Sequence, residues 1–211
     1  MTAKTLRRYT NIDELVDFLQ NNRIILRGPS RWEDKNDICL LSRFVIENRC
    51  KSVLIKCFSK AEETYLMWKA HQFDDGIRVC IEFDDTRLLE MIHSNDVRIG
   101  SVDYKTIEQF RTGVFQLSQL PFIKRYPYRG ENEFRIIYLS REKRAFERAF
   151  PIGKNCITKV IINPWIKDDD FIIQKNMIKN IPGCRELKVI KSKVLSSPSW
   201  IETVDNLKID A

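Results

Sequence analysis

The chain has 211 residues and a formal net charge of +7, from 36 basic and 29 acidic residues. A hydrophobic content of 43% and a charged content of 31% are typical of a globular protein and exclude a disordered or fibrous one. The residues at the N-terminus lack the apolar core of a signal peptide, and no apolar run approaches the about 18 residues of a membrane-spanning helix.

The cysteines indicate the compartment. Six are present, none forms a CxxC pair, and only two histidines accompany them. This pattern argues against a zinc site and is typical of a reducing environment. We therefore expect a cytoplasmic protein without a metal or a membrane segment, folded as a single domain over residues 1–211 with a loosely held tail over 195–211.

Alternating or continuous apolar runs predict strands, and apolar residues at helical spacing predict helices. In chain order, the predicted elements are a basic strand over 6–10, a helix over 12–19, a strand over 23–27, a helix over 38–48, a strand over 52–58, a helix over 61–70, a strand over 77–83, a helix over 86–93, a strand over 97–104, a helix over 106–118, strands over 131–138 and 157–162, a helix over 168–179 and a strand over 187–194. This irregular mixture predicts an α+β fold with mixed or antiparallel central sheets and flanking helices. Glycine-rich phosphate-binding loops are absent from the sequence.

Two carboxylates and an arginine alternate in the stretch that opens the predicted strand over 131–138. Glu131, Glu133 and Arg135 occupy odd positions, so in a strand they share one face, with the carboxylates about 7 Å apart. Such a face is either a working site or the solvated side of an antiparallel sheet. The spacing supports both interpretations equally.

Three further positions are candidates. Arg8 lies in the basic first strand and is either part of a solvated terminus or an arginine that binds phosphate oxygens. Ser59 ends a buried strand and is either the cap of the next helix or a site residue. Glu33, Asp34 and Asp37 lie in a polar loop and are either turn residues or magnesium ligands.

An ordered set of short motifs, over residues 6–194, resembles a widespread bacterial family known as domain of unknown function 2971. The motifs that carry the resemblance are Leu6-Arg7-Arg8-Tyr9-Thr10, Cys57-Phe58-Ser59, Met67-Trp68, Val79-Cys80-Ile81-Glu82-Phe83, Glu131-Asn132-Glu133-Phe134-Arg135 and Ile157-Thr158-Lys159-Val160-Ile161-Ile162-Asn163-Pro164.

A second resemblance concerns chemistry. An arginine on a first strand, a serine motif on a central strand and a Glu-x-Glu motif on a later strand resemble the Arg-Ser-Glu ADP-ribosyltransferases, which split NAD at the nicotinamide ribose. The matching residues are Arg8, Ser59 and Glu133, whereas Cys57 stands where those enzymes have their first serine. The resemblance implies that NAD is a substrate and that the fold is ADP-ribosyltransferase-like.

The same resemblance implies the role of each site residue. Arg8 binds the pyrophosphate, and Ser59 orients the ribose and the catalytic glutamate. Glu133 binds the ribose 2′-hydroxyl and stabilises the oxocarbenium-like transition state, while Glu131 activates the acceptor. Tyr9 or Phe58 stacks on the nicotinamide. Arg135 is the counter-charge that keeps both carboxylates ionised.

Our leading hypothesis is therefore an ADP-ribosyltransferase-like enzyme that acts as a toxin or an anti-phage defence effector, with a nucleic-acid or protein acceptor. One alternative is a metal-dependent nuclease that holds magnesium with Asp34, Asp37 and the Glu131/Glu133 pair. A sensor domain that binds nucleic acid or another ligand without catalysis is the other.

Overall fold

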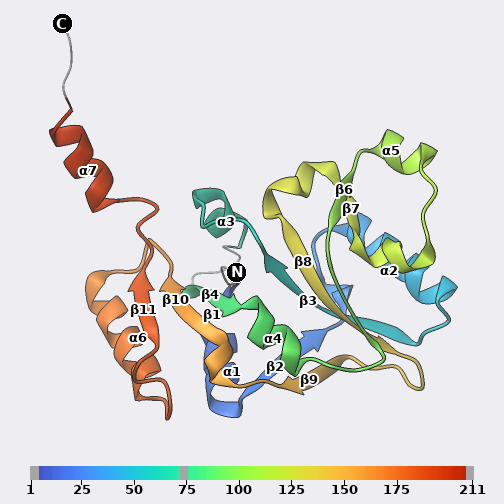
Figure 1. The fold of residues 1–211 in the computed structure, drawn as a ribbon, viewed down its shortest axis with the longest axis horizontal. Coiled ribbons are helices and arrows are strands. Elements are labelled where there is room, and N and C mark those ends of the chain that lie inside the picture. The colour runs from blue at the N-terminus through green and yellow to red at the C-terminus, as the bar shows by residue number, and fades with distance from the viewer. Residues whose placement is uncertain (1–4, 72–75, 208–211) are drawn as a thin grey trace, which may run out of the picture.

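The structure, a computed structural model, describes residues 5–71 and 76–207. Its centre is a nine-stranded sheet whose neighbouring strands are antiparallel, apart from the parallel pair β10 and β11 (Figure 1). The strands are β1 (Thr5–Asn11), β2 (Arg23–Arg27), β3 (Ser52–Ser59), β4 (Arg78–Asp84), β5 (Val97–Ser101), β8 (Glu133–Ser140), β9 (Glu147–Pro151), β10 (Ile157–Ile162) and β11 (Lys188–Lys191). The predicted α+β class with a mixed sheet is confirmed.

Helices and a second, small sheet flank this centre. The α-helices are α1 (Ile12–Asn21), α2 (Lys35–Glu47), α3 (Tyr65–Ala70), α4 (Asp85–Met91), α5 (Ile107–Thr112), α6 (Asp168–Asn180) and α7 (Pro198–Asp205). The small sheet pairs β6 (Asp103–Lys105) in parallel with β7 (Ile123–Arg125). Short 3-10 helices span Pro29–Arg31, Leu117–Phe122, Tyr126–Glu131 and Lys154–Cys156. No helix among residues 5–71 and 76–207 is long and apolar enough to cross a membrane.

The sheet forks at β3. On one side, β3 pairs with β8 over its whole length, from Ser52 to Ser59. On the other side it pairs first with β2, at Ile55, and then with β1, at Ser59. Cys57 lies between these two pairings, and its carbonyl accepts a hydrogen bond from Arg8 Nη1 at 3.1 Å. The Arg8 guanidinium therefore provides the donor that a neighbouring strand supplies elsewhere along β3.

Both faces of the two central strands, β3 and β8, are packed. On one face, apolar side chains of these strands join the large core that also contains α1, namely Leu54, Phe58, Phe134, Ile136 and residues of α1 such as Leu15 and Leu19. On the other face, α2 covers a second cluster formed by Leu41, Phe44, Val53, Ile55, Ile137 and Leu139. The face of β8 that carries Glu133 and Arg135 is thus buried beneath α2, and its interpretation as a solvated face is wrong.

Several predicted boundaries need correction. The predicted strand over 97–104 is two strands that belong to different sheets, β5 and β6. The predicted helix over 61–70 begins only at Tyr65, after a cap by Thr64. Of the tail expected over 195–211, residues 208–211 lie outside the described residues. The described part includes α7, which projects away from the sheet beyond β11 (Figure 1). The helix begins with Ser197 as its N-cap and Pro198 at its first turn, two local signals that favour a helix start.

The fork makes a prediction about Arg8. Replacing Arg8 with Met keeps most of the apolar stem but leaves the Cys57 carbonyl without its side-chain donor. We expect the free energy of unfolding to fall by about 1–3 kcal/mol, the usual cost of an unsatisfied buried acceptor. Urea denaturation followed by circular dichroism measures the loss.

Arg23→Met is the matched control, because it removes an exposed guanidinium that pairs with Asp17 at the surface. It should cost much less than Arg8→Met. Equal losses in the two variants would contradict the structural role assigned to Arg8.

Candidate functional site

A row of three residues runs straight across neighbouring strands. Arg7 on β1 is in register with Ser59 on β3, and Ser59 is in register with Glu133 on β8. Residues directly opposite one another in a sheet project from the same face, so these three side chains share one side. Arg8 follows Arg7 in the strand and projects from the other side. The structure therefore brings Ser59 and Glu133 together with Arg7, and it separates them from Arg8.

Arg8 belongs to a different environment. Its Nε lies 3.4 Å from Glu14 Oε1, and the same oxygen accepts a bond from Lys56 Nζ at 2.6 Å. These groups line a pocket of about 380 Å³ beside α1 and β2. Burial and the adjacent Arg8 charge lower the pKa of Lys56 to about 8, in spite of its bond to Glu14. The structure therefore places Arg8 in a different environment from the predicted partners Ser59 and Glu133.

Arg7 is the arginine that sequence reasoning missed. Its Nε donates to Glu82 Oε1 at 3.0 Å, Nη1 to the carbonyl of Ala61 at 2.8 Å, and Nη2 to Glu62 Oε2 at 2.7 Å. The Arg7 side chain is buried, whereas that of Glu62 is 87% exposed. Glu82 and Ala61 thus fix the guanidinium, and its outer edge meets the exposed carboxylate of Glu62.

Ser59 connects the two loops that border the row. Its Oγ donates to the carbonyl of Glu131 at 2.6 Å and accepts from the amide of Ala61 at 3.0 Å. The helix that follows, α3, is capped by Thr64 instead. The interpretation of Ser59 as a helix cap is therefore wrong, and its hydroxyl serves as a tie between the end of β3 and the segment that leads into β8.

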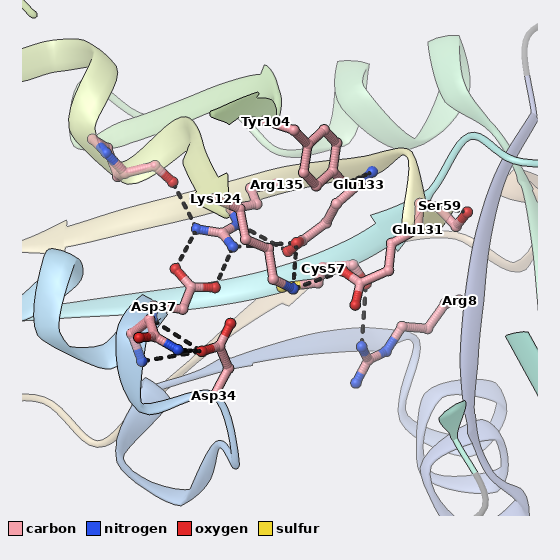
Figure 2. Close-up of polar contacts among 12 residues, drawn as sticks. Arg8, Asp34, Asp37, Cys57, Ser59, Tyr104, Lys124, Glu131, Glu133 and Arg135 are labelled. Carbon is pink, nitrogen blue, oxygen red and sulfur yellow. Dashed lines mark hydrogen bonds and ion pairs between the residues drawn. The ribbon is translucent and has the colours of Figure 1, made fainter. Parts of the chain in front are cut away.

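The centre of the site is the buried guanidinium of Arg135, which has no exposed surface. Its Nε donates to Glu133 Oε1 at 2.8 Å and its Nη2 to Glu133 Oε2 at 3.2 Å. Both terminal nitrogens also bind the carboxylate of Asp37, Nη1 at 3.1 Å, and Nη1 reaches the carbonyl of Pro121 at 2.9 Å (Figure 2). The Trp32 ring lies 5.6 Å from the guanidinium carbon. Arg135 is thus a counter-charge for Glu133, whereas the cation that contacts Glu131 is Lys124. Arg135 also joins α2 to β8 through Asp37.

A second cation joins the two glutamates. Lys124 on β7 places Nζ 2.6 Å from Glu131 Oε2 and 3.1 Å from Glu133 Oε2 (Figure 2). The Tyr104 hydroxyl accepts the backbone N–H of Glu133 at 2.7 Å. No role was predicted for Lys124 from the sequence. Glu131 and Glu133 follow Lys124 by seven and nine residues, and Lys124 itself lies on β7, which pairs with β6.

Glu131 and Glu133 approach each other for a different reason from the one predicted. The strand β8 begins at Glu133, whereas Glu131 ends a 3-10 helix. Between them Asn132 has a φ of 43°, in the left-handed region that asparagine tolerates better than most residues. The strand alternation expected at 131 is therefore wrong, and a turn brings both carboxylates to Lys124.

The electrostatics single out Glu133. Burial alone would raise its pKa, but the Arg135 and Lys124 charges outweigh burial and lower the pKa to about 2. For Asp37 and Glu131 burial prevails, and the pKa of each is raised above its ordinary value in spite of the nearby cation. Burial also raises the pKa of Tyr104 to about 12, so its phenol stays protonated at neutral pH. Glu133 is the carboxylate of the cluster that is held most firmly as an anion.

The two rings predicted to stack on the nicotinamide, those of Tyr9 and Phe58, are both buried. Tyr9 is 4% exposed and packs edge-on against Trp68, and its other neighbour is His71. Phe58 is 3% exposed and packs edge-on against Phe83 in the core. Neither ring presents a face to a nicotinamide, so we retain no stacking role for either residue.

The carboxylates of the magnesium alternative each have another partner. Asp34 caps α2 by accepting the amide of Asn36 at 3.0 Å, and Asp37 binds Arg135. The glutamates hold Lys124. Within the described ranges, no group of three or more His, Cys, Asp or Glu side chains has the arrangement of a metal site. A bound cation would thus have to compete with Arg135 and Lys124.

Comparison with known proteins gives the following. No family model matches the chain, and no curated protein matches it. Membership of domain of unknown function 2971 thus stays a resemblance. Among solved structures, Thermus sp. 2.9 DarT in complex with NAD+ is similar, with a TM-score of 0.46 and 10% identity over 92% of this chain and 97% of that chain. DarT in complex with ADP-ribosylated ssDNA has a TM-score of 0.48 and 12% identity over 92% and 96%.

The buried cluster predicts a large cost for removing one anion. Asp37→Asn keeps the shape of the side chain but removes one of the two carboxylates that compensate Arg135. We expect the free energy of unfolding to fall by about 3–5 kcal/mol, as for other broken buried ion pairs. Asp34→Asn, three residues earlier, is the control, because asparagine caps a helix about as well as aspartate. Similar losses in the two variants would show that Arg135 does not depend on Asp37.

Glu133 predicts a pH dependence. Its folded-state pKa is lowered from 4.5 to about 2, so its stabilising contribution is present above pH 4.5 and is lost as the pH falls towards 2. At neutral pH the free energies of unfolding of the wild type and Glu133→Gln should differ by about 3 kcal/mol. Urea titrations should show this difference shrinking as the pH falls from 4.5 towards 2. A difference that stays constant with pH would contradict the low pKa.

Proposed function

We propose that the chain is an ADP-ribosyltransferase-like enzyme that splits NAD+ and modifies an acceptor. The observation that carries the proposal is the row Arg7–Ser59–Glu133 on the adjacent strands β1, β3 and β8. The row contains an arginine, a serine and a glutamate in the same chain order as in the Arg-Ser-Glu transferases that the sequence resembles. Among these three residues the assignment differs from the sequence-based one only in the arginine, because Arg7 replaces Arg8.

Glu133 is the central catalytic residue of the proposed reaction. The C–N bond between nicotinamide and ribose breaks, and its electron pair leaves with the nicotinamide nitrogen. Positive charge develops on the ribose, and a fixed carboxylate beside it lowers the barrier. In the free protein the Arg135 charge, and after it the Lys124 charge, lower the pKa of Glu133 to about 2, so the carboxylate is ionised at neutral pH. No metal is needed for this step.

Arg7 and Ser59 position the substrate and the carboxylate. Arg7 would bind the pyrophosphate through the guanidinium edge that now meets the exposed Glu62. Ser59 lies between Arg7 and Glu133 in the row and holds the carbonyl of Glu131. The hydroxyl therefore fixes the turn that sets the distance between the two glutamates, which favours a positioning role.

Glu131 would act on the acceptor. Its side chain is 29% exposed, compared with 5% for Glu133, so an incoming nucleophile reaches Glu131 more easily. The acceptor atom forms a bond to the ribose carbon and gives its proton to the Glu131 carboxylate, whose raised pKa suits a base. A nucleic acid or a protein is the proposed acceptor, and the net charge of +7 favours a polyanion. We propose a cytoplasmic location and a role as a toxin or an anti-phage defence effector.

Nicotinamide release from NAD+, followed by chromatography, tests the proposal. Glu133→Gln should lower the rate by about 10²–10³-fold, the usual cost of losing one group that stabilises transition-state charge. Among variants that remain folded, Arg7→Lys should raise the KM for NAD+, whereas Arg8→Lys should leave it unchanged. Release that survives Glu133→Gln, or a KM that depends on Arg8 rather than on Arg7, would overturn the assignment.

A further inference from the structure

Lys124 covers one oxygen, Oε2, of the carboxylate that the proposed reaction uses. The Glu133 carboxylate is already in contact with cations at both oxygens: Oε1 accepts from Arg135 Nε, and Oε2 accepts from both Arg135 Nη2 and Lys124 Nζ. A carboxylate oxygen has two lone pairs in its plane, so Oε2 has no free acceptor position. A ribose hydroxyl can bind Oε2 only after one of these two donors has left.

Arg135 is not the donor that can leave. Its guanidinium has no exposed surface and is also held by Asp37 and by the carbonyl of Pro121. Moving it would leave the buried carboxylate of Asp37 without its cation, at a large cost.

Lys124 can leave more easily. It lies on β7, a three-residue strand whose partner is the equally short β6, outside the nine-stranded sheet. A lysine ammonium is a compact charge on a flexible stem, so it changes position at lower cost than a fixed guanidinium. The Tyr128 ring centre lies 4.7 Å from Nζ, so the ammonium already has one contact outside the glutamate pair.

We propose that Lys124 acts as a latch. In the free protein its ammonium bridges the carboxylates of Glu131 and Glu133, and it withdraws when the ribose of NAD+ binds Glu133. This inference rests on the proposed function. With Lys124 in place, the cluster contains the three carboxylates of Asp37, Glu131 and Glu133 and two cations. Withdrawal of the ammonium leaves one more uncompensated negative charge at the point where the substrate develops positive charge.

The first test is binding of the analogue carba-NAD+ by isothermal titration calorimetry. Lys124→Met removes the competing ammonium, so we expect binding about tenfold tighter than in the wild type, close to the value of one charge-assisted hydrogen bond. Lys124→Arg keeps a cation and should not tighten binding. Lys105→Met is the matched control, because Lys105 lies on the neighbouring strand β6 and pairs with Asp103 instead. It should leave the affinity unchanged.

A second measurement needs no variant. In the free protein, the Lys124 side chain is 11% exposed, compared with 28% for Lys105. Acetylation by a water-soluble reagent, read by mass spectrometry, should increase several-fold at Lys124 when carba-NAD+ saturates the protein. The Lys105 signal should not change. A lysine with only a structural role would stay equally protected or become more protected.

The outcomes separate the two proposals. Wild-type binding together with equal or weaker binding by Lys124→Met overturns the latch and leaves the proposed function intact. Unchanged labelling of Lys124 at saturation also overturns the latch. If neither the wild type nor folded Lys124→Met binds carba-NAD+, the proposed function fails, and the latch fails with it.

Discussion

The structure depends most on the burial of one positive charge. Arg135 lies within the central sheet without any exposed surface, and an isolated guanidinium there would be very costly. Asp37 from α2 and Glu133 from the same strand compensate it, and the carbonyl of Pro121 takes a further N–H. These contacts fix α2, β8 and the segment before β7 relative to one another. The same contacts hold Glu133 as an anion, so the stability of this region and the chemistry of the site have one physical origin.

The fork in the sheet, where β3 changes its partner from β2 to β1, brings Arg7 beside Ser59. Because β3 exchanges one neighbour for another along its length, β1 pairs with it at a single position, Arg7 opposite Ser59. This position is also where Ser59 faces Glu133. The two arginines of the first strand consequently have different roles. Arg8 donates a hydrogen bond to the carbonyl of Cys57, between the two strand pairings of β3. Arg7 instead pairs with Glu82 on β4.

Sequence periodicity was sufficient for most strands and for the placement of Glu133 and Arg135 on a common face. It could not decide between Arg7 and Arg8. Leu6 and Tyr9 are both buried on opposite faces of β1, so the pattern of apolar residues does not show which face carries the site. The burial of Arg135 was also out of reach, since its partner Asp37 is 98 residues away. The turn at Asn132 and the position of Lys124 depend on backbone conformation and on the β6–β7 pairing, which local pattern does not encode.

The central claim is that the substrate binds on the α2 side of the fork, along the row Arg7–Ser59–Glu133. A crystal structure with carba-NAD+ tests this most directly. Our account predicts that a ribose hydroxyl lies within hydrogen-bonding distance of Glu133 Oε2, that the pyrophosphate contacts Arg7, and that Lys124 has moved away from Glu133. A ligand bound instead on the α1 side, in the pocket lined by Arg8, Glu14 and Lys56, would contradict it.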